Sequence, residues 1–120
     1  NTSLAGDDIV QLIDLPADTM VIGGCLEVLE ASGNANVTLD VGTSTDVDAF
    51  VDGGASNAAA DIQFNLKAAG GNIVTSADTV MVTVLDSGSS GTTALRFRVH
   101  AVCVDISRNP TESATVSTGT

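Results

Sequence analysis

Apolar and polar residues alternate with a period of two along much of this 120-residue chain, and this pattern limits what it can fold into. In segment 93–106, Leu95, Phe97 and Val99 fall on one face and Arg96, Arg98 and His100 on the other. Successive side chains of a β-strand point to opposite faces. No window carries an apolar stripe of helical period for long. The sequence therefore predicts strands rather than helices.

Five further segments have strand character: 8–15, 20–30, 36–42, 61–66 and 79–86. Segment 20–30 is apolar on both faces over part of its length, which predicts a central strand. Its Gly23-Gly24 pair indicates a bulge or a close backbone approach. Turn residues separate the segments, as at Pro16. Several short strands with turns between them predict one antiparallel β domain, either a sandwich or a barrel.

The region 42–60 is the longest without strand alternation, and long insertions of this kind are often functional or interface loops. It contains three carboxylates in seven residues, Asp46, Asp48 and Asp52, which could begin a calcium site. It lacks the closing Glu of an EF-hand, and Phe50 interrupts it. We expect a solvated acidic turn with no bound metal, with the calcium site as the alternative.

The charge balance excludes one class of function. The chain has 15 acidic and 4 basic residues, and its formal net charge is −11. Phosphate attraction dominates nucleic-acid affinity and has the wrong sign here, so no nucleic-acid partner is expected. No stretch reaches the roughly 18 apolar residues that span a bilayer, so no membrane partner is expected either.

Catalytic residues are scarce. His100 is the single histidine and lies in mid-strand, and no nucleophile elbow or phosphate-binding loop accompanies it. Cys25 and Cys103 each lie in an apolar run, and we expect both to be buried free thiols, with a disulfide between them as the alternative. The sequence therefore predicts a protein that is not an enzyme and uses no cofactor.

The stripe of Arg96, Arg98 and His100 has two interpretations. Cross-strand pairing with acidic residues on a neighbouring strand is the first. The second is a docking patch for the acidic surface of a partner, and the two are compatible.

The stretch IDLPADTMVIGGCLEVLEASGNANVTLDVGTSTDVDAFVDGG, followed later by ALRFRVHAVCVD, resembles the capsid decoration (cement, or head) proteins of tailed bacteriophages. The shared pattern is an LPA-type turn, a strand containing Gly-Gly, and a T-L-D-V-G strand that runs into a D-x-D-x-F-x-D-G loop. The resemblance implies an all-β, antiparallel β-sandwich of jelly-roll type. It also implies a location on the outer capsid surface of the virion, where the protein bridges coat subunits.

This resemblance divides the chain into an N-terminal arm (1–8), a β-sandwich (9–106) and a polar C-terminal arm (107–120). It implies the major capsid protein as a partner, and a symmetric homo-oligomer for which a trimer is favoured over a dimer. The residues expected at partner contacts are basic or lie in the arms: Asn1, Thr2, Ser3, Leu4, Lys67, Arg96, Arg98, Arg108, Asn109, Pro110 and Val116. The alternative function is an extracellular β-sandwich adhesin module that depends on calcium.

Overall fold

The structure is a computed structural model that describes residues 4–66, 72–88, 91–92 and 94–107. The regular elements of the described residues are all β-strands. Among them no helix has the length and apolar character needed to cross a membrane. The strands are β1 (Ile9–Leu15), β2 (Thr19–Glu30), β3 (Val37–Gly42), β4 (Val51–Ala55), β5 (Ala60–Gln63), β6 (Ile73–Val74), β7 (Asp78–Asp86) and β8 (Arg96–Asp105).

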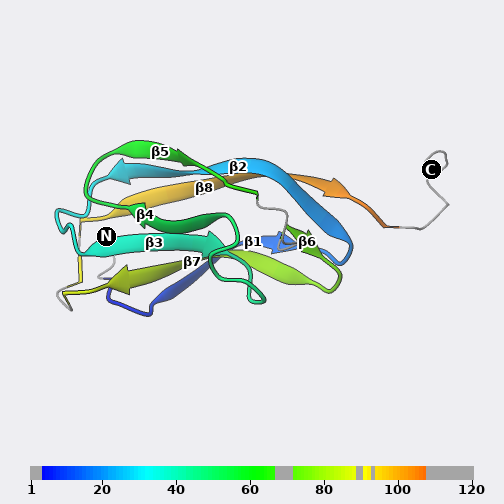
Figure 1. The fold of residues 1–120 in the computed structure, drawn as a ribbon, viewed down its shortest axis with the longest axis horizontal. Coiled ribbons are helices and arrows are strands. Elements are labelled where there is room, and N and C mark those ends of the chain that lie inside the picture. The colour runs from blue at the N-terminus through cyan, green and yellow to red at the C-terminus, as the bar shows by residue number, and fades with distance from the viewer. Residues whose placement is uncertain (1–3, 67–71, 89–90, 93, 108–120) are drawn as a thin grey trace.

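The strands form two antiparallel sheets packed face to face (Figure 1). One, here called the β7 sheet, has the order β1-β7-β3-β4. In the other, the β2 sheet, β8 pairs along one edge of β2 while β5 and β6 pair with the two ends of its other edge. Most connections cross from one sheet to the other. The prediction of an all-β antiparallel sandwich is confirmed, and β2 is central as expected.

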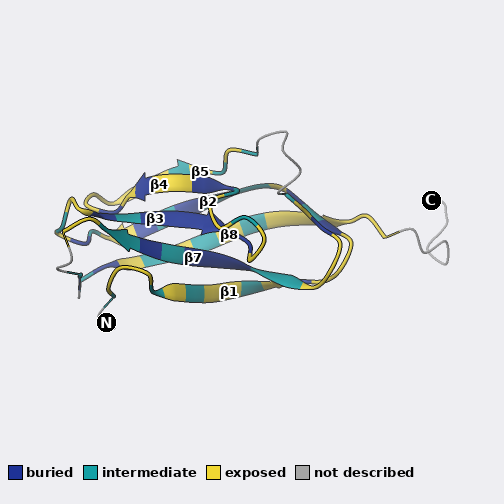
Figure 2. Ribbon diagram, turned by 60° about the horizontal axis from the view of Figure 1, so that its bottom comes forward, coloured by how far each residue is buried: buried dark blue, intermediate teal, exposed yellow. Residues whose placement is uncertain are grey.

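The core lies between the sheets and consists mainly of aliphatic residues. Figure 2 shows the buried residues concentrated in β3, β7 and the facing part of β2. Alternate residues of β3 and β7 point inward at the periodicity that the sequence predicts, and residues of β2 also point inward, with a spacing that a bulge changes. These fully buried residues are Val37, Leu39, Val41, Val80, Val82, Val84, Val21 and Leu26. Each such burial stabilises the fold by roughly 1.5–3 kcal/mol before the entropy cost.

The expected bulge in β2 changes which residues face outward. Val21 pairs with Cys103 and Gly23 with Val102, so Ile22 is the extra residue. Val21 and Leu26 both point inward although five positions separate them. Gly24 has φ 154°, and a Cβ on it would overlap the carbonyl oxygen of His100 and approach the Phe64 ring to 2.6 Å. Glycine is needed here because the backbone and an aromatic ring occupy the space.

One side of the sandwich is closed by an aromatic pair. The rings of Phe50 and Phe64 stack with centroids 5.0 Å apart, a spacing typical of offset-stacked aromatic residues. Backbone bonds hold both in place: the Phe64 amide donates to the Gly24 carbonyl, and the Asn65 amide donates to the Phe50 carbonyl. The chain thus uses two of its three Phe residues to join the sheets.

The structure differs from the sequence prediction in the region 42–60, where β4 lies. Two glycines in Val51–Ala55 conceal its alternation, and its register with β3 is broken by a bulge beside Val41. Val51 nevertheless points into the core.

The expectation for the cysteines is half wrong. Both are free, but Cys25 is only half-buried and Cys103 is exposed. The last four residues of β8, Val102–Asp105, are all exposed, so this end of the strand lacks cover on both faces. An apolar run therefore did not guarantee burial. The partial burial of the Cys103 thiol that the fold does provide raises its pKa.

Candidate functional site

The basic stripe of β8 lies on the outer face of the β2 sheet and pairs with acidic residues of β2. Antiparallel register places Arg98 opposite Glu27 and Arg96 opposite Glu30. The Arg98 Nε donates to the Glu27 Oε1 at 2.6 Å, and Arg96 lies 3.9 Å from a Glu30 oxygen. The first interpretation of the stripe, cross-strand pairing, is therefore observed.

Glu27 is the centre of this polar group. His100 Nε2 lies 3.1 Å from the same Glu27 oxygen that accepts from Arg98. The hydrogen bond from Arg98, followed by that of His100, lowers the pKa of Glu27. The hydrogen bond to Glu27 in turn raises the pKa of Arg98. Both groups are thus charged at neutral pH, and the arginine side chain is 58% exposed.

The other half of this outer face is apolar. Residues opposite one another in an antiparallel pair share a face. The register therefore groups the outward residues Met20, Ile73, Val102 and Val104. The bulge residue Ile22, which has no partner in the register, is exposed beside Val102 and joins this group. Four of them are exposed large hydrophobic residues, and Val102 reaches 57% exposure. The outer face of the β2 sheet is accordingly divided along the strands into a charged half and an apolar half.

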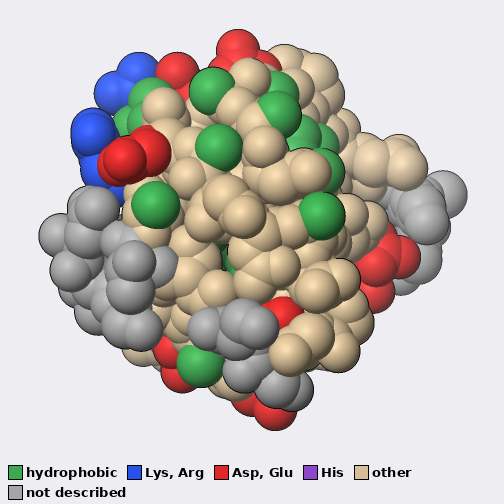
Figure 3. All heavy atoms as spheres, turned by 90° about the vertical axis from the view of Figure 1, so that its left-hand side faces the viewer, with side chains coloured by type: hydrophobic (Ala, Val, Ile, Leu, Met, Phe, Trp, Pro, Cys, Tyr) green, Lys and Arg blue, Asp and Glu red, His purple; other side chains and the backbone are tan. Residues whose placement is uncertain are grey.

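Charge is distributed unequally between this face and the rest of the molecule. Among the described residues, the face carries Glu27, Glu30 and Asp61 against Arg96 and Arg98. The rest of the described chain carries 11 acidic residues and neither Lys nor Arg. Figure 3 shows the basic side chains at one corner beside acidic ones, with other acidic side chains around the remaining edges. One face is thus nearly neutral in a strongly acidic molecule.

A second group of charges gathers three carboxylates from β3, the loop that follows it and β4. Asp40, Asp48 and Asp52 offer oxygens that all lie within 4.8 Å of one another. Asp46, which the sequence analysis placed in this set, is not in it: its carbonyl accepts from the Thr43 and Ala49 amides in a turn.

The sequence pattern did not identify Asp40, because in segment 36–42 the alternation of Val37, Leu39 and Val41 predicts that Asp40 faces solvent. It is only 6% exposed, and one of its oxygens accepts from the Gly53 amide at 2.7 Å. Burial, with additions from Asp52 and Asp48, raises the pKa of Asp40 despite that hydrogen bond. Hard cations prefer such oxygen ligands, so among the described residues these three could hold one.

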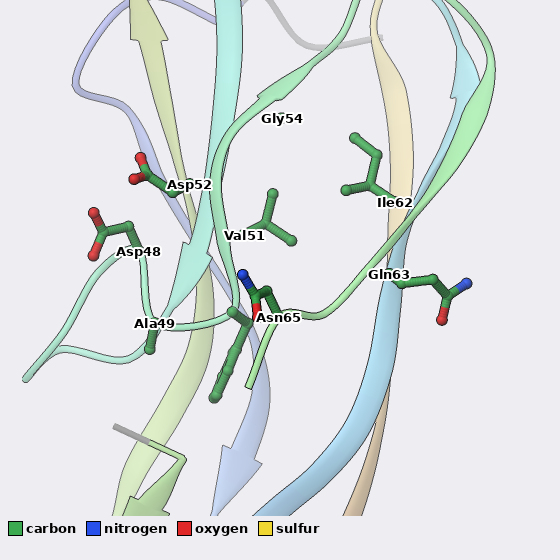
Figure 4. A pocket seen from close by; sticks show the side chains of 9 residues that line it. Asp48, Ala49, Val51, Asp52, Gly54, Ile62, Gln63 and Asn65 are labelled. Atoms are coloured by element: carbon green, nitrogen blue, oxygen red, sulfur yellow. The ribbon is translucent and has the colours of Figure 1, made fainter. Parts of the chain in front are cut away.

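A pocket of about 390 Å³ includes Asp48 and Asp52 in its lining and lies between β4 with the loop before it and β5 with the segment after it. Figure 4 shows Asp48 and Asp52 together at one side of it and Gln63 at the other. Its described lining contains carboxylates, amides and apolar groups but neither His nor Cys. His100 lies on the outer face of the β2 sheet, so the described part of the chain does not bring it to this pocket.

The remaining expected contact residues fall in two groups. Leu4 is part of the fold: it exchanges backbone hydrogen bonds of 2.8 Å with Thr92, and the Asp7 amide donates to Val84. In the expected N-terminal arm, Leu4, Asp7 and Asp8 are therefore hydrogen-bonded to the sandwich through Thr92 and Val84. The others lie outside the described residues: Asn1, Thr2, Ser3, Lys67, Arg108, Asn109, Pro110 and Val116.

Comparison with known proteins gives a structural likeness. No protein-family model matches the sequence, and no curated protein matches it. The fold is similar to a chain in a solved structure entitled "Capsid of Ralstonia phage GP4", with a TM-score of 0.64 and 20% sequence identity. The match covers 84% of this chain and 75% of the other.

Proposed function

We propose that this chain is a virion structural protein that binds the outer surface of an assembled bacteriophage capsid as a symmetric oligomer. Its partner there is the major capsid protein, and it stabilises the shell by bridging coat subunits. The observation that carries the proposal is the likeness of the fold, over most of the chain, to a chain in a phage capsid structure. The sequence resemblance to decoration proteins supports the same role.

The chemistry of the described residues agrees with a structural role. The pocket lining contains no nucleophile–base pair, and the His100 side chain is paired with Glu27 on an open sheet face. The acidic surface keeps particles that carry many copies mutually repulsive. Many weak contacts on one closed shell add avidity, so a clamp of this kind needs no deep binding site.

The C-terminal residues 108–120 test this proposal, because we expect them to act as an arm on neighbouring subunits. A chain ending at Ser107 should keep its fold and lose occupancy on expanded capsids of the virus that encodes it. Occupancy is measured by cosedimentation and gel densitometry, with the full chain as the reference. Unchanged occupancy would contradict the arm. Absence of binding by the full chain would contradict the proposed function.

The alternative is a calcium-dependent adhesin module, and the carboxylates of Asp40, Asp48 and Asp52 beside the pocket favour it. Glycan titrations with calcium and with a chelator separate the two functions. Chelator-sensitive glycan binding supports the adhesin. A thermal midpoint unchanged by calcium, together with no glycan binding, removes it.

A further inference from the structure

We propose that two copies of this chain pack face to face through the outer face of the β2 sheet. The two-fold axis runs parallel to the strands, between β2 and β8, so that each β8 lies over the β2 of the second copy. The inference rests on the proposed function, which includes self-association of the chain. It adds the surface through which two copies associate and the symmetry that relates them.

The apolar half of this face is the first argument. Ile22, Ile73, Val102 and Val104 are 47%, 40%, 57% and 42% exposed. They come from three strands, yet the register brings Ile73, Val102 and Val104 to one side of one sheet end, and the exposed bulge residue Ile22 lies next to them in β2. A contiguous exposed apolar patch with a polar border is typical of a protein interface.

The distribution of charge indicates which partner fits. With 11 acidic residues and no Lys or Arg elsewhere in the described chain, two copies repel one another through their other surfaces. The outer face of the β2 sheet carries both signs in nearly equal number. It is therefore the described surface on which a second copy can approach at least electrostatic cost.

The order of residues along the strands then selects the axis. Glu30 of β2 lies opposite Arg96 of β8 at one end of the sheet, and Met20 lies opposite Val104 at the other end. Along this direction the outward residues of β8 change from basic to apolar, and those of β2 change from acidic to apolar. A two-fold axis parallel to the strands exchanges the two rows. It places Arg98 over Glu27 of the second copy and keeps the apolar halves together. An axis across the strands would lay an apolar half on a charged half.

The size of the face is of the same order as that of a standard interface. The 12 residues of β2 extend about 40 Å, and three strands span about 14 Å, so the projected area is roughly 550 Å². Accessible area exceeds projected area, and a standard interface buries about 800 Å² on each partner. An isologous contact of this kind yields a dimer, whereas the decoration-protein resemblance favours a trimer.

Sedimentation velocity on the full chain tests the inference, with a pair of variants matched in exposure. Val102→Lys places a charge in the apolar half, and Ile9→Lys places the same charge at an equally exposed residue on the β7 sheet; both residues are 57% exposed. We expect a dimer for the wild type and for Ile9→Lys. Val102→Lys should raise the dimer dissociation constant at least ten-fold with an unchanged circular dichroism spectrum.

Charge reversals test the register and do not depend on an apolar substitution that could affect folding. Arg98→Glu alone and Glu27→Arg alone each place like charges across the interface and should weaken self-association. When the two variants are mixed, both symmetric contacts of a heterodimer join opposite charges, although the pair within each chain stays broken. We therefore expect the mixture to form heterodimers more tightly than either variant forms homodimers, as native mass spectrometry would record.

The outcomes are distinct from those for the proposed function. A wild-type chain that stays monomeric up to about 0.1 mM, or forms a trimer, overturns the two-fold contact whether or not capsids bind it. Equal weakening by both lysine variants, or no heterodimer preference in the mixture, overturns it as well. Capsid binding that fails while the dimer persists overturns the proposed function and leaves this contact intact.

Discussion

Gly24→Ala perturbs the feature that determines which residues of β2 face outward. The added Cβ would overlap the His100 carbonyl oxygen and come within 2.6 Å of the Phe64 ring, at a φ of 154°. The carbonyl belongs to the paired strand β8 and cannot rotate away as a side-chain end would. The change therefore strains the bulge, the β2–β8 ladder and the Phe50–Phe64 pair together.

Two effects give the expected magnitude. A residue held in a sparsely populated backbone region costs about 1–3 kcal/mol. Inserting a methyl group into filled space costs typically about 1–3 kcal/mol. Their sum is roughly 2–6 kcal/mol, a large share of the roughly 5–15 kcal/mol that stabilises a domain. The neighbour Gly23 is the matched control, because a Cβ there meets no atom within 4 Å.

Urea unfolding followed by far-ultraviolet circular dichroism measures the difference, since the chain has no Trp or Tyr to report by fluorescence. We expect Gly24→Ala to lose at least about 2 kcal/mol of unfolding free energy, or about 8 °C in thermal midpoint. Gly23→Ala should remain within about 1 kcal/mol of the wild type. Equal stabilities for the two variants would refute the reasoning about the bulge.

Three further changes test other parts of the structure. Leu39→Ala empties a fully buried core position and should cost about 2–5 kcal/mol in urea unfolding; a loss below about 1 kcal/mol would contradict the core assignment. Ser56→Ala removes a buried hydroxyl that bonds Ser32 and the Val37 carbonyl, with an expected loss of about 1–3 kcal/mol. Asp40→Asn keeps an acceptor for the Gly53 amide and removes a buried charge, so unfolding at pH 7 should show a gain in stability. Because the pKa of Asp40 is raised in the folded state, that gain should shrink as pH falls through the pKa of Asp40 in the folded state and vanish below its pKa in the unfolded state. A gain that is independent of pH would contradict this assignment.

The alternation of apolar residues predicted most of the sandwich because a strand with one buried face carries its orientation in the sequence. Val37, Leu39 and Val41 are an example, since their period of two matches their burial. The Gly23-Gly24 pair predicted the bulge because glycines inside a strand are a local signal of a bulge or a close backbone approach. The sequence did not predict β4, because the strand has few inward positions and its two glycines have no side chain to indicate which face is buried.

The candidate sites depended on contacts that the sequence does not encode locally. By its position in the alternation Asp40 was expected to face solvent, but it is buried, and the loop after β3 together with β4 brings Asp48 and Asp52 beside it. Cys103 looked buried because its neighbours are apolar, yet the end of β8 has no cover on either face. The pairing of Arg98 with Glu27 needed the register across the bulge, which no spacing in the sequence supplies.

The presence of this chain in virus particles tests the central claim most directly. Particles of the virus that encodes it, purified by density gradient, would be quantified by mass spectrometry for this chain and the major coat protein. The proposed function requires a fixed ratio between this chain and the major coat protein that matches a symmetric position on the shell. It also requires that this chain can be released from the particles without loss of the coat protein. Absence of the chain from purified particles, or an amount that varies between preparations, would contradict it.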